Sequence, residues 1–489
     1  WHSEPDLLSN HDHKSAHRPD PDALLVEIAR YAHRQPIDSA LSFETARHCL
    51  MDSIACGLMA LAYPACRRVL GPVVPGATLA DGARVPGCEW SLDPVQAAFN
   101  IGALVRWLDF NDTWLAAEWG HPSDNLGAIL AVADWRSRGG RPPGAAPPTV
   151  RDVFTAMIKA HEIQGVLALE NSFNRVGLDH VLLVRVASTA VATVMLGGSQ
   201  GQVIDAVSNA WVDGGALRTY RHAPNTGSRK SWAAGDATAR AVRLALLTMT
   251  GEMGYPSALS TPRWGFQDVL FKGQALKLAR PLDSYVMENV LFKISYPAEF
   301  HAQTAVECAL ALHAEVRGRL DEVTEVLIET QEPGVRIIDK TGPLSNPADR
   351  DHCIQYMSAI PLIFGRLTAA DYEDDVAADP RVDALRARMR VVENPQFTSD
   401  YYAPDKRFIG NAMQVKFRDG STTRRVQVDY PIGHRLRRAE GIPLLEAKFE
   451  AAVRAHYPAP QAQDLVGLFA DPKALQGLPV PQLMGALAL

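Results

Sequence analysis

A short stretch of the chain concentrates side chains that could transfer protons. This stretch contains carboxylates, a histidine, an amide and hydroxyls, and tryptophans and a phenylalanine are interspersed among them. The polar residues are Asp109, Asn111, Asp112, Thr113, Glu118, His121, Ser123 and Asp124. Apolar helical segments flank them, so they cannot all be solvated surface. Ser123 is predicted to cap the following helix, because its hydroxyl can accept a first-turn N–H. His121 then precedes a helix N-terminus, which favours an anion, so the stretch predicts a site for an anionic ligand.

A second concentration of functional side chains is cationic. Residues 218–235 (RTYRHAPNTGSRKSWAAG) hold Arg218, Arg221, Arg229 and Lys230 and no acidic residue. The whole chain has a formal net charge of −6, so it must gather cations locally to bind a polyanion. This loop therefore predicts a binding site for carboxylates, although a solvated surface loop is the ordinary alternative.

Three further strings carry candidate residues, and each has an ordinary structural explanation. His180 ends RVGLDH (175–180) and could be a hydrogen-bonded structural histidine. Lys293 lies in FKISYPAEFH (292–301) and could extend its ammonium group from an apolar run to water. Tyr356 ends DHCIQY (351–356) and could be core, while Asp109 itself could pair with Arg106. The sequence alone leaves these alternatives open.

The composition and motifs argue against several classes of protein. The acidic balance gives no sign of nucleic acid or an anionic membrane as a partner, and no apolar run has the length of a transmembrane helix. His161-Glu162 resembles the start of a zinc-protease motif, but Gly165 stands where the second histidine is needed. The six cysteines are scattered without a Cys-x-x-Cys pair, which argues against an iron–sulfur cluster and predicts reduced thiols in a cytoplasmic protein. No nucleotide-binding or nucleophile-elbow motif is apparent, so we expect acid–base chemistry without a cofactor or metal.

The elements that must position these residues are mainly helices. Apolar spacing predicts helices within residues 21–66, 95–108, 150–169, 180–196, 202–212, 232–248 and 444–489, with Gly/Pro-rich connections at 69–90 and 139–148. Residues 322–330 and 389–392 are predicted strands, and residues 411–430 a β-hairpin that turns at Asp419-Gly420. The polar residues 1–20 are predicted to be a disordered lead-in and not a signal peptide. The fold class is therefore mainly α with an α+β part.

The strings LDFNDT (108–113) and HPSDNLGAI (121–129) resemble those of the MmgE/PrpD family. Residues 228–241 (SRKSWAAGDATARA) and 292–307 (FKISYPAEFHAQTAVE) resemble the same family, and the likeness extends loosely from about residue 21 onward. The resemblance implies a large all-helical domain from residues 21–290 and 432–489. It also implies an inserted α+β lid domain at residues 291–431 that moves on substrate binding, and a homodimer built on the helical domain.

By this resemblance, the family's active-site positions fall on Asp109, Thr113, His121, His180, Lys230, Lys293 and Tyr356. We predict that Asp109 and His121 form the acid–base pair, with His180 as partner or alternative. Lys230, Lys293 and the arginines, including Arg221 and Arg229, are predicted to hold carboxylates and developing charge, while Thr113 and Tyr356 orient a hydroxyl group.

The resemblance also implies the reaction. We expect elimination of water from 2-methylcitrate, a small tricarboxylate, to give 2-methyl-cis-aconitate in propionate breakdown, with citrate or cis-aconitate as possible further substrates. Decarboxylation of cis-aconitate and epimerisation of a dicarboxylate are alternatives within the family. The decarboxylating branch has a shorter link before its His-Pro-Ser and lacks the Glu-Trp-Gly present here at 118–120. A non-catalytic tricarboxylate-binding protein is the alternative from another class.

Overall fold

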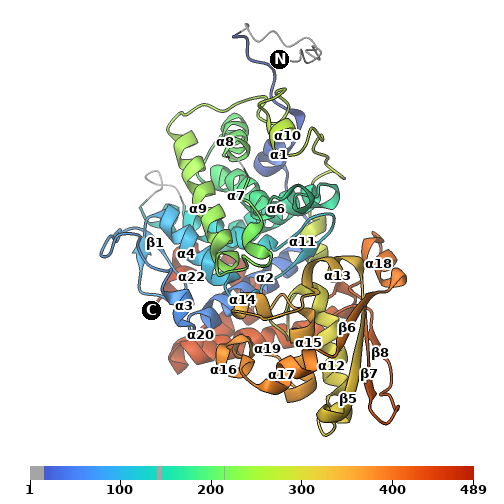
Figure 1. Cartoon of the computed structure of the whole chain (residues 1–489). Coiled ribbons are helices and arrows are strands. Elements are labelled where there is room, and N and C mark those ends of the chain that lie inside the picture. Colours follow the sequence, from blue (N-terminus) through green and yellow to red (C-terminus); the bar gives the residue numbers. More distant parts are fainter. Residues whose placement is uncertain (1–15, 140–145, 214) are drawn as a thin grey trace, which may run out of the picture.

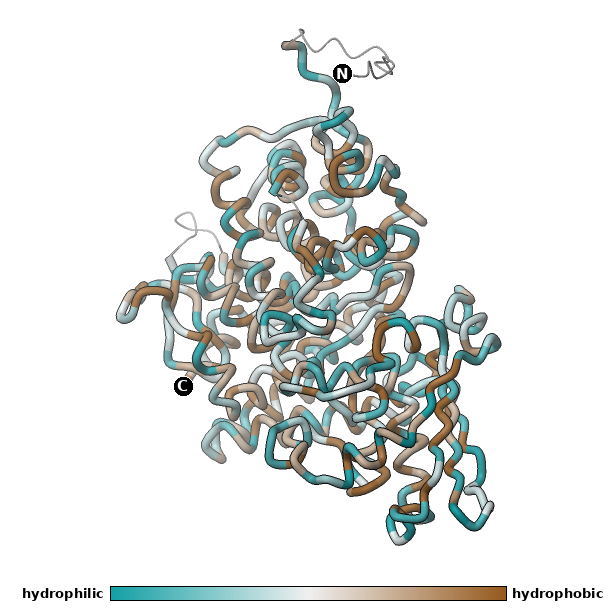
Figure 2. The backbone as a smooth tube through the Cα atoms, in the orientation of Figure 1, coloured by the Kyte–Doolittle hydropathy of each residue, from teal (hydrophilic) through white to brown (hydrophobic). Residues whose placement is uncertain are grey.

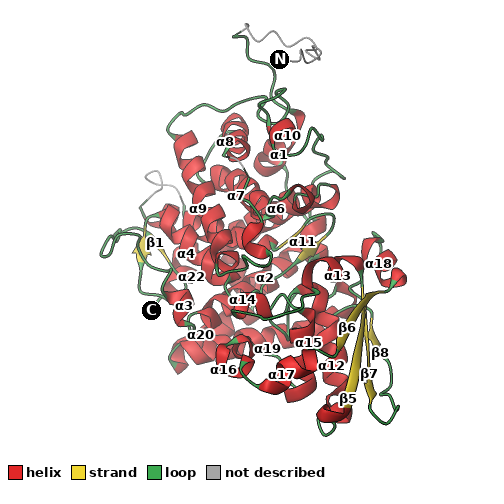
Figure 3. Cartoon of the chain, viewed as in Figure 1, coloured by secondary structure: helices red, strands yellow, loops and turns green. Residues whose placement is uncertain are grey.

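Most of the chain is helical, and the longer strands gather at one end of the molecule (Figures 1 and 3). The computed structural model describes residues 16–139, 146–213 and 215–489. The predicted lead-in lies mainly outside the described residues. Within the described part, no helix is long and apolar enough to cross a membrane.

The larger domain consists of helices from both ends of the chain, and Figure 2 shows hydrophobic segments running through its middle. Its first part contains α1 (Ala23–Arg34), α2 (Ala40–Ala60), α3 (Pro64–Arg67), α4 (Pro94–Arg106), α5 (Leu126–Arg138), α6 (Val150–Glu170), α7 (Val181–Met195), α8 (Gln200–Val212), α9 (Arg229–Met249), α10 (Phe266–Val269) and α11 (Tyr285–Asn289). The C-terminal part adds α19 (Arg438–His456), α20 (Ala459–Ala470), α21 (Pro472–Gly477) and α22 (Val480–Leu487). Two small hairpins join β1 (Ala83–Arg84) to β2 (Ser91–Leu92) and β3 (Trp114–Leu115) to β4 (Trp119–Gly120).

Close packing of α4, α5 and α9 places three parts of the site side by side. A Cβ added at Gly235 of α9 would lie 2.4 Å from the carbonyl oxygen of Phe99 in α4. One added at Gly102 would lie 3.0 Å from the Cα of Gly235, so only glycine permits this approach. The helix α4 ends just before the acidic loop, α5 follows His121, and α9 begins beside Lys230.

The smaller domain has a four-stranded sheet in the order β6-β5-β7-β8, which Figure 1 shows in yellow to red at the lower right. The strand β5 (Val323–Thr330) pairs in parallel with β6 (Met389–Glu393) and antiparallel with β7 (Asn411–Phe417), which forms a hairpin with β8 (Val426–Val428). These pairings confirm the predicted strands and hairpin. Helices complete the domain: α12 (Gln303–Val316), α13 (Glu332–Ile338), α14 (Pro347–Arg350), α15 (Ile354–Phe364), α16 (Asp374–Ala377), α17 (Pro380–Arg386) and α18 (Pro395–Tyr402).

The buried apolar residues form two main clusters. One joins residues between 25 and 294 to residues between 432 and 487, and the other runs from residue 298 to residue 417. The chain therefore leaves the helical core near Ile294 and returns to it at Ile432. These limits lie close to the predicted domain boundaries at 291 and 431.

The predicted cap at Ser123 is wrong. Ser123 lies inside a 3₁₀ turn, Pro122–Asn125, and α5 starts only at Leu126 without a side-chain cap. The Asp112 carboxylate accepts the backbone N–H of Ser123 at 3.0 Å, and the Ser123 hydroxyl accepts from the Asn111 amide at 2.8 Å. The Ser123 hydroxyl is thus used by the Asn111 amide and does not cap the helix.

Candidate active site

A small enclosed cavity lies where the two domains meet. The helical domain and the segment that joins the domains contribute most of its lining, and the smaller domain closes it: Arg106, Asp109, Thr113, Leu115, Trp119, His121, His180, Arg218, Arg221, Lys293, Glu299, Phe300, Ile337 and His352. Its volume is about 20 Å³, which is room for about one water molecule. A ligand the size of a tricarboxylate does not fit into this volume. A larger cavity of about 930 Å³ has a mainly apolar lining that includes none of these cations.

Asp109 is a buried anion held by two cations. Its backbone has a φ of 49°, a left-handed conformation that is uncommon for aspartate. The Lys293 ammonium donates to its carbonyl oxygen at 2.8 Å and to its Oδ1 at 2.6 Å, and Arg106 pairs with the same carboxylate. Burial alone would raise the pKa of Asp109, but Arg106, Lys293 and Lys230 hold it well below its usual range. The prediction left open which member of the Asp109–His121 pair is the acid, and this pKa direction disfavours Asp109 as the proton donor.

His121 is arranged as a proton acceptor. Its Nδ1 lies 2.7 Å from the carbonyl oxygen of Asp112, which can only accept, so Nδ1 carries the proton. No described residue hydrogen-bonds to Nε2, so its lone pair is left free, 3.7 Å from Oδ1 of Asp109. Burial, Arg106 and Lys293 lower the pKa of His121 well below its usual value, outweighing Asp109. The imidazole is therefore neutral near pH 7, as a general base must be.

His180 and two arginines form the opposite part of the cavity wall. Neither ring nitrogen of His180 has a hydrogen-bond partner among the described residues, although its Nδ1 is 3.3 Å from Asp179. Its ring meets that of His121 edge to face at 5.6 Å. Arg221 pairs with Asp179, and Arg218 lies over the Trp119 ring at 5.2 Å with Nη1 lacking a hydrogen bond. Among the described residues, buried nitrogens of His180 and Arg218 thus lack a hydrogen bond at one cavity, which indicates groups that bind a ligand.

The smaller domain contributes an acid–histidine pair that reaches Lys230. The Lys230 ammonium donates to both oxygens of Asp351, at 2.8 and 2.7 Å, and His352 donates from Nδ1 to the same carboxylate at 2.6 Å. His352 also lies 3.9 Å from the carboxylate of Asp109. Burial and Lys230 lower the pKa of His352. Lys230 thus connects the two domains behind the cavity wall instead of lining the cavity.

The structure separates the candidates into two groups. Asp109, Thr113, His121, His180, Arg221 and Lys293 line the cavity, whereas Lys230 lies behind it and is connected to the lining residue His352 through Asp351. Arg229 does not: it pairs with Asp236 on the outside of α9 and lines a different hollow. Tyr356 is buried in the second cluster, where its hydroxyl donates to the carbonyl of Asp371 at 2.6 Å. Direct substrate contact is therefore unsupported for these two residues.

Sequence reasoning missed several cavity residues. Glu299 was passed over entirely, and Arg106 was considered only as a partner of Asp109. Arg218 was predicted to bind carboxylates only as one of the arginines of the acid-free loop, and His352 belongs to a string that was singled out but received no role. The signal was available for Arg218, because it shares the acid-free loop with Arg221. For Glu299 there was none, because its place beside His301 and the cavity depends on tertiary packing.

Within the described part of the chain, two groups have ligand atoms close enough to hold a metal ion. One comprises Asp109, Asp351 and His352, and the other comprises Cys49, Asp112 and His161. In the first group the lysines already neutralise both carboxylates, with Lys293 on Asp109 and Lys230 on Asp351. All six cysteines are free and buried.

The arrangement resembles known proteins along nearly its whole length. The MmgE/PrpD N-terminal domain model matches residues 26–279, and the MmgE/PrpD C-terminal domain model matches residues 296–468. This chain belongs to the MmgE/PrpD family. Among family members, the 2-methylcitrate dehydratase of Cupriavidus necator is 61% identical, covering 98% of this chain and 99% of its own. The 2-methylcitrate dehydratase of Salmonella typhimurium is 60% identical, and the match covers 96% of this chain and 97% of that enzyme. The mitochondrial 2-methylcitrate dehydratase of Yarrowia lipolytica is 59% identical, and the match covers 92% of this chain and 87% of that enzyme.

Proposed function

We propose that this protein is a 2-methylcitrate dehydratase, a hydro-lyase that converts 2-methylcitrate to 2-methyl-cis-aconitate and water. The high identity to enzymes of that name over almost the full length supports the substrate. The observation that carries the chemistry is the free Nε2 of neutral His121 in a cavity ringed by Arg106, Arg218, Arg221 and Lys293. Such a cavity suits a substrate with three carboxylates and a transition state with additional negative charge.

The reaction needs a base for a C–H proton and an acid for the departing hydroxyl group. His121 Nε2 takes the proton from the carbon next to a carboxylate, and the C–H electrons form the new C=C bond. The C–O bond breaks toward oxygen, which leaves as water once it has received a proton. Asp109, 3.7 Å from Nε2, stabilises the imidazolium that forms.

Lys293 is the proton donor that fits best. Its ammonium group has three N–H bonds, of which two point to Asp109, and it lines the cavity. Burial lowers the pKa of Lys293, although Asp109 opposes the effect, so the ammonium is a stronger acid than an exposed one. His180 is the alternative base, since the neighbouring Asp179 would stabilise its protonated ring.

Turnover of two substrates tests the function. Purified protein, treated with a chelator, is mixed with 2-methylcitrate or with cis-aconitate, and alkene absorbance and released carbon dioxide are followed. We expect alkene from 2-methylcitrate without added metal, because the fixed cations supply the positive charge. Carbon dioxide from cis-aconitate would instead identify a decarboxylase. If neither compound gives alkene or carbon dioxide, the epimerase and the binding protein would be the remaining functions.

The pH dependence of kcat/KM follows from the two shifted groups. Protonation of His121 removes the base, and its lowered pKa keeps the base available further into acid than an ordinary histidine would. The acid limb should therefore lie below pH 6.5, after correction for ionisation of the substrate. Deprotonation of Lys293 removes the acid, so the basic limb should lie below pH 10.5. An acid limb above 6.5 in initial-rate profiles would contradict the assignment of His121.

One wall of the cavity can distinguish 2-methylcitrate from citrate. Its apolar members pack in one cluster: Leu115, Trp119, Phe300 and Ile337. A methyl group buried there contributes about 0.8 kcal/mol, or about fourfold in kcat/KM. We expect Ile337→Ala to lower kcat/KM for 2-methylcitrate about fourfold more than it lowers kcat/KM for citrate. If citrate is not turned over, its affinity is measured instead as that of a competitive inhibitor.

The control for this wall is the neighbouring residue. Ile338 is fully buried in the second cluster and does not line the cavity, so Ile338→Ala should lower stability without changing the preference. Equal loss for both ligands in Ile337→Ala would show that the methyl group binds elsewhere.

We also propose that the enzyme needs no cofactor and works in a reducing compartment, the cytoplasm. The cationic cavity supports the first statement, and the six unpaired cysteines support the second. The homodimer and the movement of the smaller domain stay predictions from the family resemblance. The 20 Å³ cavity supports such movement, because a tricarboxylate cannot enter it.

A further inference from the structure

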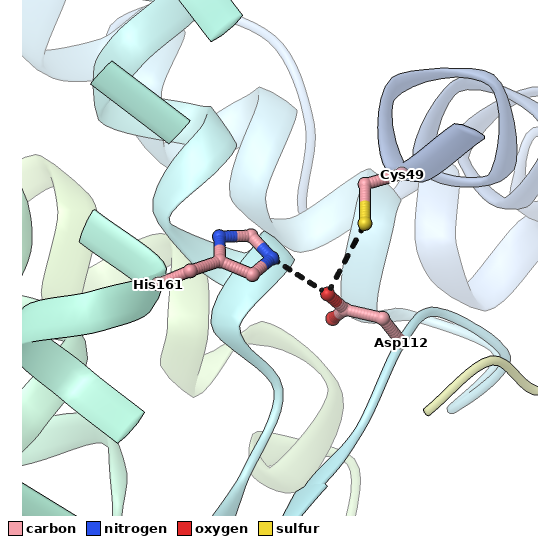
Figure 4. A group of neighbouring side chains, drawn as sticks. All are labelled: Cys49, Asp112 and His161. Carbon is pink, nitrogen blue, oxygen red and sulfur yellow. Dashed lines mark hydrogen bonds and ion pairs between the residues drawn. The ribbon is translucent and has the colours of Figure 1, made fainter. Parts of the chain in front are cut away.

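A second group of titratable residues lies directly behind the cavity and does not line it. Asp112, His161 of α6 and Cys49 of α2 point toward one another, as Figure 4 shows. The Nε2 of His161 lies 2.8 Å from Oδ2 of Asp112, and the Cys49 thiol donates to the same oxygen at 3.8 Å. The Asp112 and His161 side chains are each only 1% exposed, so solvent cannot supply these contacts.

The hydrogen bonds of His161 require a shared proton. Its Nδ1 lies 2.9 Å from the carbonyl oxygen of Met157, an acceptor, so Nδ1 carries a proton. A neutral imidazole would then present a lone pair at Nε2 to a carboxylate oxygen, and two acceptors repel at 2.8 Å. One more proton must therefore lie between His161 and Asp112, so that one of the two donates to the other across this 2.8 Å contact.

Asp112 connects this pair to the proposed base. Its Oδ1 accepts the backbone N–H of Ser123 at 3.0 Å, two residues after His121. Its carbonyl oxygen accepts the Nδ1–H of His121 at 2.7 Å. One residue thus holds both the ring of His121 and the backbone that follows it, while His161 and Cys49 anchor that residue to two helices.

We propose that Asp112, locked by His161, is the positioning residue that fixes the tautomer and orientation of His121. The proposal rests on the proposed function in taking His121 as the base. Without the hydrogen bond between His161 and Asp112, the loop that carries Asp112 and His121 can move. The proton of His121 can then shift from Nδ1 to Nε2, which would remove the lone pair from the cavity. Neither Asp112 nor His161 touches the substrate in this assignment.

A buried metal site is a poorer explanation of the same group. Metal–ligand bonds of about 2.0–2.1 Å at tetrahedral angles place two ligand atoms about 3.3 Å apart. The 2.8 Å separation of Nε2 and Oδ2 is instead that of a hydrogen bond. Both oxygens of Asp112 and both nitrogens of His161 already have partners.

Two substitutions at one position test the proposal. Asp112→Ala removes the lock, and we expect kcat to fall about 10–100-fold with KM within about threefold, because the carboxylate-binding cations remain. Asp112→Asn can keep both contacts of this side chain. The amide oxygen accepts the backbone N–H of Ser123, and the amide N–H donates to Nε2 of a neutral His161. We expect Asp112→Asn to retain kcat within about fivefold.

A buried acid elsewhere in the helical domain provides the control. Asp134 accepts from the Arg84 backbone at 2.8 Å and from its guanidinium at 2.9 Å, away from the cavity. Asp134→Ala should lower the melting temperature without lowering kcat below the transition. An equal fall of kcat in Asp134→Ala and Asp112→Ala would overturn the positioning role, as would an Asp112→Asn variant as inactive as Asp112→Ala.

Two measurements test the proposal without turnover. Nitrogen chemical shifts of ¹⁵N-labelled histidines, with His121 assigned by its loss in His121→Asn, should show Nδ1–H in the wild type and a tautomer mixture in Asp112→Ala. An unchanged tautomer in Asp112→Ala, or stoichiometric zinc or copper that Cys49→Ala or His161→Gln abolishes, would refute it. Failure of the wild type to dehydrate 2-methylcitrate would instead refute the proposed function and leave the tautomer test valid.

Discussion

Replacement of His121 by asparagine is expected to lower kcat by about 10²–10⁴-fold, the usual contribution of a general base. Asparagine can keep the hydrogen bond to the Asp112 carbonyl through its amide N–H, but it lacks a basic nitrogen. The loop should therefore stay in place, and KM should change little. Steady-state kinetics with 2-methylcitrate, together with melting temperatures, measure both effects.

His180 provides the comparison for this experiment. If His121 is the base, His180→Asn should lose less in kcat than His121→Asn and more in KM, because His180 then only contacts the substrate. A larger loss of kcat in His180→Asn would transfer the role to His180 and its neighbour Asp179, which lie 3.3 Å apart. Wild-type kcat in His121→Asn would remove His121 from the chemistry.

Lys293→Met should reduce kcat/KM by about 10³-fold, because it removes both a fixed cation and the proposed proton donor. The change also deprives the carbonyl and carboxylate of Asp109 of their donor, which costs about 1–3 kcal/mol in the free energy of unfolding. Lys293 lowers the pKa of His121, so its loss should raise that pKa and move the acid limb of kcat/KM to higher pH. Rate profiles and denaturant unfolding measure these effects.

Lys448 is a matched control for Lys293. Its side chain is only 7% exposed, and it donates to the carbonyl of Phe110 at 3.0 Å, to Asp52 at 2.7 Å and to the backbone carbonyl of Lys293 at 2.9 Å, so it holds the same part of the chain. It does not line the small cavity. We expect Lys448→Met to cost comparable stability but less than tenfold in kcat/KM. Equal kinetic losses in the two variants would show that Lys293 acts only by holding the loop.

The local patterns of the chain predicted its elements well. The spacing of Val415 and Phe417 around an Asp-Gly turn predicted the hairpin that β7 and β8 form, because strand alternation is a local property. The small-residue helix after Lys230 was likewise predicted, and Gly235 lets it pack closely on α4. The cap at Ser123 failed, because Ser123 lies inside a 3₁₀ turn and its hydroxyl accepts from the Asn111 amide instead of from a first-turn N–H.

The sequence by itself determined which residue types were available: the acidic loop, the histidines and the acid-free cationic loop. Only the tertiary structure decided which of them meet. Asp109 and Lys293 are 184 residues apart in the chain and 2.6 Å apart in space, and that contact helps to keep Asp109 charged. Arg229 and Tyr356 were credible candidates until packing turned them away from the cavity. Charge, tautomer and pKa depend on burial and on the distance to other charges, and sequence patterns carry neither quantity for residues brought together by folding.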